Sequence, residues 1–268
     1  MISRRNSGPV GVQNGRIRQS IFRFAARFAA PAVMFVAVLG TACSVQQQVR
    51  TNPDLSAESD MEVRLSDEML AYLLDLSGVL GVEPGEVSPF DLEQLALLMQ
   101  EEPGLTLLHA DIPENARLVL TVAADEIQQV LTEGPNRVEG LVSFEESEVE
   151  GGVERTLILK LNDERVQQIT GLSPVQEESA VDFLLPPEAM GEDEYVEYLA
   201  WAMEEYEQDS PIEEVIRNAA IDLEIVVPGQ LISVEGGRAE ENAAVFSERV
   251  VRLLTVRDVT RWSVTWRE

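Results

Sequence analysis

The stretch that decides the fold is VEGLVSFEESEVE (138–150) followed by GGVERTLILKL (151–161). Two runs of strand-forming residues flank Gly151-Gly152, and a two-residue glycine connection is typical of a β-hairpin. In the second run, leucines alternate with other residues between Thr156 and Leu161. This alternation is typical of an antiparallel strand that is buried on one face. The sequence therefore predicts an antiparallel sheet in this part of the chain.

Working outward from the hairpin, strand patterns also occur near both ends of the chain. They are found at 61–65, 105–110, 116–124, 221–227, 230–235, 243–256 and 261–266. Gly236-Gly237 follows one of these runs and predicts a second hairpin.

Helical patterns separate the strand groups. We expect helices at 66–76, 88–102, 125–133, 163–172, 175–185, 192–207 and 211–218. The clearest is EDEYVEYLAWAMEEYE (192–207), because its aromatic and aliphatic residues share one stripe. That stripe comprises Tyr195, Tyr198, Leu199, Ala202 and Tyr206. The fold class predicted is α+β: an antiparallel sheet built from hairpins near both ends, with several helices inserted between.

Charge is divided unevenly between the head of the chain and its body. The 268 residues carry 20 Lys and Arg against 48 Asp and Glu, a net charge of −28. Residues 1–42 hold six arginines and no acid, so residues 43–268 carry a net charge of −34. A body this acidic excludes general nucleic-acid binding, because phosphate backbones attract Lys and Arg. A basic head on an acidic body is typical of a targeting segment.

The head has the three parts of a secretory signal. An arginine-rich segment, 1–27, precedes the uncharged run FAAPAVMFVAVL (28–39). Three small residues, 40–42, follow, and then comes Cys43, the only cysteine. This arrangement resembles the lipobox of bacterial lipoproteins. There the cysteine receives a diacylglyceryl group on sulfur and, once cleavage has made it the N-terminus, a fatty acyl group such as palmitate on its amine.

The lipobox resemblance implies cleavage between Ala42 and Cys43 and lipidation of Cys43. The sequence departs from the usual pattern at one position, because Leu39 stands four residues before the cysteine instead of three. Other interpretations are open. The uncharged run Phe28–Val45 is 18 residues long, at the lower limit for an uncleaved membrane-spanning signal anchor. An ordinary signal cut elsewhere would leave Cys43 as a free or buried thiol.

The segment after the cysteine, SVQQQVRTNPDLSAESD (44–60), is polar and lacks apolar periodicity. We expect residues 43–60 to be the lipidated cysteine with a flexible tether, whose reach is about 20–25 Å. A tether of this length exceeds the Debye length of about 8 Å and would hold the acidic body away from a charged membrane surface. The expected organisation is a removed signal peptide over 1–42, this tether, and a single α+β domain over 61–268.

The C-terminal block IDLEIVVPGQLISVEGG (221–237) has a strand, a Pro-Gly turn, a short strand and a Gly-Gly turn. It resembles a pattern in uncharacterised bacterial envelope lipoproteins of the spirochaete type and, more distantly, in mycobacterial LppM-like proteins. The resemblance implies an α+β or β-rich envelope domain with a lipid-contacting role. It transfers no catalytic residue to this chain.

Residues that could support catalysis or metal binding form no recognisable site. Phosphate-binding and nucleophile-elbow motifs are absent from the sequence. One Cys and one His, His109, provide neither a disulfide framework nor a zinc site. Two acid runs, Glu145–Glu148 and Glu192–Glu194, lack the spacing of a calcium loop. We therefore expect no catalytic residue, no metal site and no cofactor.

The leading hypothesis is a bacterial envelope protein that is lipid-anchored on the periplasmic or outer-membrane side. Its body would bind or scaffold without catalysing, and its partners would be the membrane, through the anchor, and an envelope lipid or protein. Two alternatives stay open: a carboxylate-dependent envelope hydrolase, which needs only two acids, and a signal-anchored membrane protein.

Overall fold

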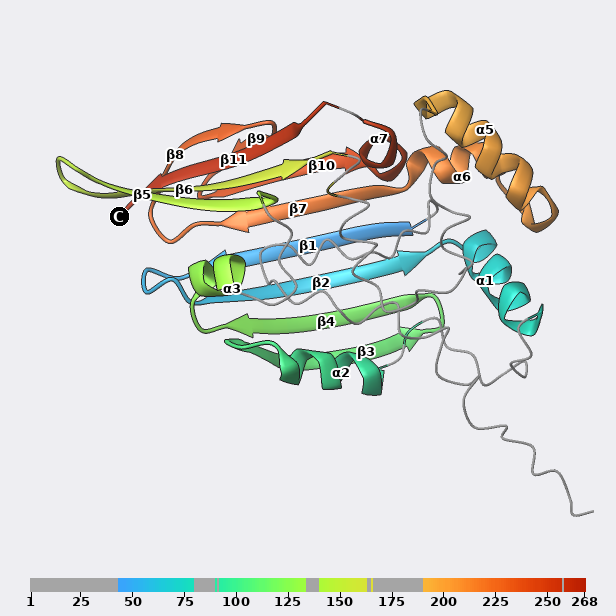
Figure 1. Cartoon of the computed structure of the whole chain (residues 1–268), viewed down its shortest axis with the longest axis horizontal. Helices are drawn as coiled ribbons and strands as arrows, with labels where there is room; N and C mark the ends of the chain where they lie inside the picture. The colour runs from blue at the N-terminus through green and yellow to red at the C-terminus, as the bar shows by residue number, and fades with distance from the viewer. Residues whose placement is uncertain are drawn as a thin grey trace, which may run out of the picture.

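The computed structural model describes residues 43–79, 90, 92–133, 140–162, 165, 190–256 and 258–268. Their strands form a seven-stranded and a four-stranded sheet (Figure 1). The predicted α+β class is confirmed. The helix predicted at 175–185 lies outside the described residues, as does the one predicted at 163–172 except for Arg165, which is helical.

The larger sheet has the strand order β3-β4-β2-β1-β7-β10-β9. Its strands are β1 (Cys43–Thr51), β2 (Ala57–Leu65), β3 (Leu105–Glu114), β4 (Arg117–Ala124), β7 (Ala220–Val226), β9 (Arg238–Glu240) and β10 (Ala243–Arg249). All neighbours are antiparallel except β1 and β7, which run parallel and join the N-terminal strands to the C-terminal ones.

β1 lies at the centre of this sheet, so the prediction of a flexible tether over residues 43–60 is wrong. Val49 is paired with Ser59 of β2 on one side and with Ile225 of β7 on the other. Val45, Gln47, Val49 and Thr51 alternate inward and are buried. The polar composition of the segment concealed this alternation, because only two of the four inward residues are apolar.

The smaller sheet contains the hairpin predicted from 138–161, which is confirmed. Its strands are β5 (Val142–Val149), β6 (Gly152–Leu161), β8 (Gln230–Glu235) and β11 (Thr260–Arg267), in the order β5-β6-β11-β8. The register pairs Val149 with Gly152, and Gly151 has a φ of 97°. A positive φ is readily adopted only by glycine, so the turn depends on this residue.

The second glycine pair does not form the predicted hairpin. Strand β8 before it pairs with β11 in the smaller sheet, whereas β9 after it pairs with β10 in the larger sheet. The chain thus crosses between the sheets at Gly236-Gly237. A Cβ atom on Gly237 would lie 2.5 Å from the ring of Phe246 and 2.6 Å from the carbonyl oxygen of Val245. The glycine is needed for close packing at this crossing.

The helices gather mostly at one end of the larger sheet (Figure 1). They are α1 (Asp67–Val79), α2 (Leu92–Glu101), α3 (Ile127–Glu133), α5 (Glu192–Met203), α6 (Ile212–Asn218) and α7 (Val250–Thr255), with the short 3-10 helix η3 (Glu204–Tyr206). The strand predicted over 243–256 ends at Arg249, and α7 completes the segment. Burial of Val250 and Val251 on this helical turn overrides their preference for strand.

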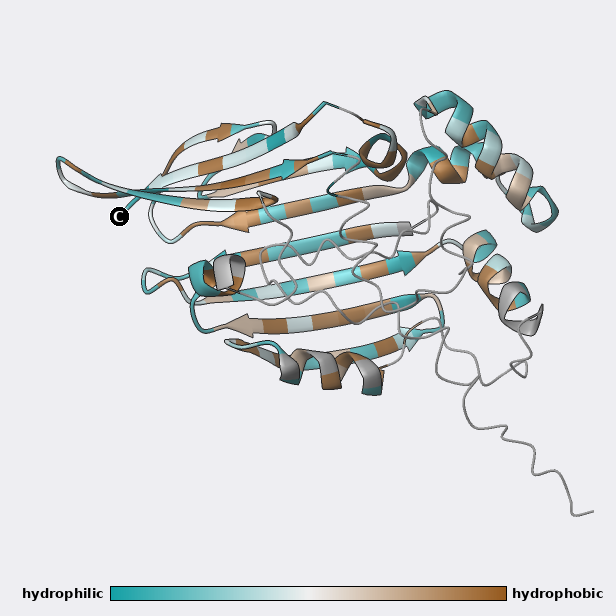
Figure 2. Cartoon of the chain, in the orientation of Figure 1, coloured by the Kyte–Doolittle hydropathy of each residue, from teal (hydrophilic) through white to brown (hydrophobic). Residues whose placement is uncertain are grey.

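The core lies on the inner face of the larger sheet, where part of it meets the smaller sheet. Phe246 of β10 stacks on Trp262 of β11, with ring centroids 5.2 Å apart. One inner row crosses five strands through paired positions. This row is Leu120, Met61, Gln47, Leu223 and Phe246. Figure 2 shows the resulting alternation of apolar and polar residues along the strands.

Candidate functional site

The predicted lipidation site lies at the start of the central strand. Cys43 is the first residue of β1, and its backbone is paired with Leu65 at the end of β2. Ala42, the other half of the predicted cleavage site, lies outside the described residues. Helices α1, α5, α6 and α7 lie at the same end of the sheet (Figure 1). This end, with Cys43 and the helices around it, is the candidate functional site.

All four tyrosines of the chain lie among these helices: Tyr72, Tyr195, Tyr198 and Tyr206. The rings of Tyr72 and Tyr206 meet edge to face, with centroids 5.5 Å apart. The hydroxyl of Tyr206 donates a hydrogen bond to Asp75 of α1 at 2.9 Å. Burial, followed by the hydrogen bond to Asp75, raises the pKa of Tyr206. The phenol therefore stays protonated at neutral pH and joins η3 to α1.

The outward face of α5 carries the most exposed large apolar side chain described, Trp201, which is 70% exposed. Tyr195 and Leu199 of the predicted stripe are buried, as are Val196, Ala200 and Met203, whereas Tyr198, Ala202 and Tyr206 are half-buried. Trp201 lies off that stripe. Sequence reasoning missed it, although a tryptophan opposite an apolar stripe is a signal that could have identified it.

The outer face of the larger sheet carries a ladder of polar side chains. Asp60 accepts hydrogen bonds from Thr121 and Arg50, each at 2.8 Å. Gln48 donates to Glu224 at 2.8 Å and so connects β1 to β7. The ladder thus spans four strands, and its acids are held by neighbours within the protein.

Glu62 of β2 extends the same outer face toward the Cys43 end. It accepts a hydrogen bond from Arg117 of β4 at 2.6 Å. This hydrogen bond is the main cause that lowers the pKa of Glu62. A carboxylate held in this way serves to join neighbouring strands and is poorly suited to accept a proton.

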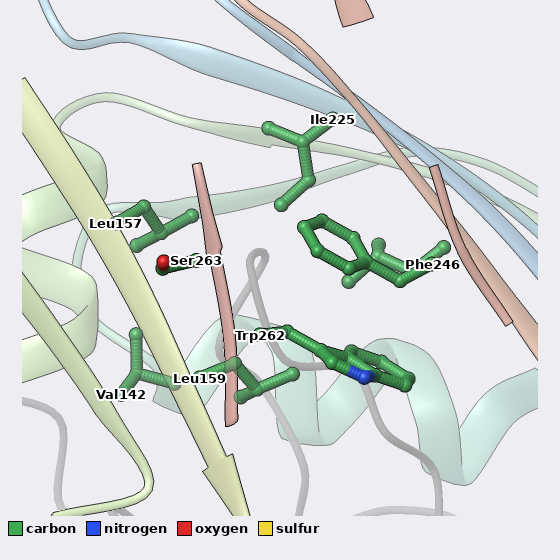
Figure 3. A pocket seen from close by; sticks show the side chains of 8 residues that line it. Val142, Leu157, Leu159, Ile225, Phe246, Trp262 and Ser263 are labelled. Atoms are coloured by element: carbon green, nitrogen blue, oxygen red, sulfur yellow. The ribbon is translucent and has the colours of Figure 1, made fainter. Parts of the chain in front are cut away.

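Between the two sheets lies a cavity of about 10 Å³ (Figure 3). Its lining is Val142, Leu157, Leu159, Leu223, Ile225, Phe246, Trp262 and Ser263. This space holds roughly one water, whereas small-molecule sites enclose about 300–1,000 Å³. The interface between the sheets is therefore packed core.

The remaining residues singled out from the sequence are dispersed. His109 is exposed on β3, at the edge of the larger sheet, and Glu145–Glu148 lie exposed on β5. In the first turn of α5, Glu192 pairs with Arg249 at 2.7 Å and Asp193 with Arg217 at 2.8 Å. Within the described part of the chain, no three His, Cys, Asp or Glu residues are grouped so that they could hold a metal.

Comparison with known proteins gives one structural likeness. No family model matches the sequence, and no curated protein is similar to it. The chain is similar to the NMR structure of the folded domain of LppM from Mycobacterium tuberculosis, with 9% identity and a TM-score of 0.34, over 84% of this chain and 90% of that one. Among the helices that the structure describes, none is both long and apolar enough to cross a membrane.

Proposed function

We propose that the protein is a lipid-anchored bacterial envelope protein whose α+β body binds or scaffolds a partner and does not catalyse. The observation that carries the proposal is the position of Cys43. The only cysteine follows the predicted export signal and is also the first residue of the central strand. Cleavage before Cys43 would therefore remove the signal and leave the whole of β1 in place.

The start of β1 also weighs against the signal-anchor alternative. The uncharged run Phe28–Val45 overlaps β1 at residues 43–45, which are strand. Only residues 28–42 are then available for a spanning helix. Fifteen residues rise about 23 Å in an α-helix, whereas the hydrocarbon core of a bilayer is about 30 Å thick.

Lipidation at Cys43 would place the folded body directly on the membrane. Each buried CH₂ of an acyl chain contributes about 0.8 kcal/mol, and two chains suffice for stable attachment. The net charge of −34 over residues 43–268 is repelled by anionic lipids. Attachment would therefore rely on the acyl chains. Because β1 starts at Cys43 with no tether between them, the Cys43 end of the sheet would be the part nearest the bilayer.

The surface is the part of the body best suited to recognition. The cavity between the sheets has room for roughly one water. Trp201 on α5, by contrast, exposes most of a large aromatic side chain at the Cys43 end. Within the residues that the structure describes, these two features favour binding of a macromolecular partner on the outside over enclosure of a small molecule between the sheets.

Intact mass spectrometry of the membrane-extracted protein tests the anchor. We expect a chain that begins at Cys43 and carries the added mass of the diacylglyceryl and acyl groups. Cys43→Ser should abolish both processing and added mass, whereas the neighbouring substitution Ser44→Ala should preserve both. An unmodified chain of 268 residues that is indifferent to Cys43→Ser would contradict the proposal.

A further inference from the structure

The outward face of α5 combines an exposed tryptophan with acids one turn away on each side. Trp201 is 70% exposed. Glu197 lies four residues before it and Glu204 three residues after it, and both are exposed. Residues at these spacings share one face of a helix. Neither glutamate forms an ion pair with another described residue. We call Glu197, Trp201 and Glu204 the α5 face.

The stability of the fold does not explain the α5 face. Glu204 is the C-cap of α5, and the last turn of this helix contains no basic residue. The C-terminus of a helix carries partial negative charge, so an acid there is unfavourable and Lys or Arg would be favoured. Exposure of the Trp201 ring leaves a large apolar surface in water. Glu204 therefore lowers the stability of the helix and Trp201 lowers solubility, and neither makes a described contact that compensates.

We propose that the α5 face docks a basic segment of a protein partner, in which an arginine stacks on Trp201 and neighbouring basic side chains pair with Glu197 and Glu204. Tryptophan is the best aromatic acceptor for a guanidinium through cation–π contact. Tryptophan is also enriched among the residues that dominate binding energy at protein interfaces. The flanking carboxylates provide the complementary charge and increase the rate of encounter with a basic partner.

The same charges argue against a bilayer as the occupant of the α5 face. Tryptophan is common at membrane interfaces, where basic residues usually accompany it. Here the companions of Trp201 are glutamates, which anionic lipids repel. The α5 face thus fits a basic protein segment better than a lipid surface. This inference deepens the proposed binding role and is independent of the lipid on Cys43.

Fluorescence anisotropy of dye-labelled octa-arginine, titrated with the full protein in non-ionic detergent, tests the inference. We expect Trp201→Ala to weaken binding by about tenfold or more, and Trp201→Phe, which keeps an aromatic face, to weaken it less. The double variant Glu197→Gln/Glu204→Gln should also weaken binding by about tenfold.

A matched control separates local recognition from the general attraction of a −34 body for a cation. Glu145→Gln/Glu148→Gln removes the same charge from exposed positions on β5 and should change affinity by less than about threefold. Equal losses in the two double variants would overturn the inference, as would full binding by Trp201→Ala. Retention of binding in Cys43→Ser distinguishes failure of the lipid anchor from failure of the α5 face.

Quenching of Trp201 fluorescence by acrylamide distinguishes a protein segment from a bilayer as the partner of the α5 face. Trp262 and Trp266 are 3% and 1% exposed, so accessible fluorescence comes from Trp201. In protein reconstituted into phosphatidylcholine vesicles containing phosphatidylglycerol, Trp201 should stay accessible to acrylamide. Added octa-arginine should then protect it. Protection by the vesicles alone, without the peptide, would assign the α5 face to the membrane and contradict the proposal.

Discussion

The two faces of the larger sheet are built from the same strands but are stabilised by different interactions. On the inner face, Phe246 stacks on Trp262 and the neighbouring positions are close-packed. On the outer face, Arg50, Asp60 and Thr121 are joined by hydrogen bonds at partly exposed positions. Burial of apolar area contributes far more to stability than ion pairs near water. The inner face should therefore determine stability, while the outer face mainly maintains solubility and register.

The largest expected difference between the faces is at two adjacent residues of β10. Phe246→Ala should lower the free energy of unfolding by about 3–5 kcal/mol, because it leaves a cavity against Trp262. Ser247→Ala, on the exposed side, should change it by less than about 0.5 kcal/mol. Urea denaturation followed by circular dichroism measures both, and similar losses in the two variants would remove the distinction between the faces.

A smaller difference is expected within the glutamine run of β1. Gln47 is buried, and its side-chain amide donates a hydrogen bond to Ser59 at 2.8 Å. Gln47→Ala leaves the buried hydroxyl of Ser59 without this partner and should cost about 1–3 kcal/mol. Gln48→Ala removes a part-buried bond to Glu224 on the outer face and should cost about 1 kcal/mol or less. Equal costs, measured by the same denaturation, would show that β1 does not alternate as described.

The smallest effect concerns pH and the outer face. Arg117 lowers the pKa of Glu62 in the folded state below its ordinary value of 4.5. Because the folded pKa is the lower one, the pair stabilises the protein above the unfolded pKa, and this contribution disappears as pH falls through the folded pKa. Glu62→Gln should therefore cost about 1 kcal/mol or less at pH 7 and nothing near pH 2. A cost that persists unchanged in acid would contradict the assigned role of the pair.

The sequence predicted the fold well where apolar residues follow a clear period. The hairpin of β5 and β6 and the amphipathic helix α5 were identified because each pattern lies within one short segment of the chain. Two other predictions failed because the local pattern of apolar residues was weak or misleading. The inward face of β1 is half polar, so its strand period is weak although it pairs with both β2 and β7, and burial of the valines of α7 overrides their preference for strand.

The candidate site was predictable only in part. Cys43 was predicted as a lipidation site because the residues before it have the local pattern of charge, hydropathy and small residues that is typical of an export signal. The α5 face was not predicted, although the helical period places Trp201 off the apolar stripe of α5. The proximity of α1, α5 and the start of β1 also depends on tertiary structure (Figure 1).

The central claim is that β1, which starts at Cys43, is the middle strand of the larger sheet. Amide hydrogen exchange over residues 44–51 tests this claim most directly, because backbone pairing with β2 and β7 on both sides should protect these amides. We expect exchange as slow as that of the inner strands β2 and β7. Exchange at the rate of an unstructured peptide would show that the segment is a tether and contradict the structure of this region.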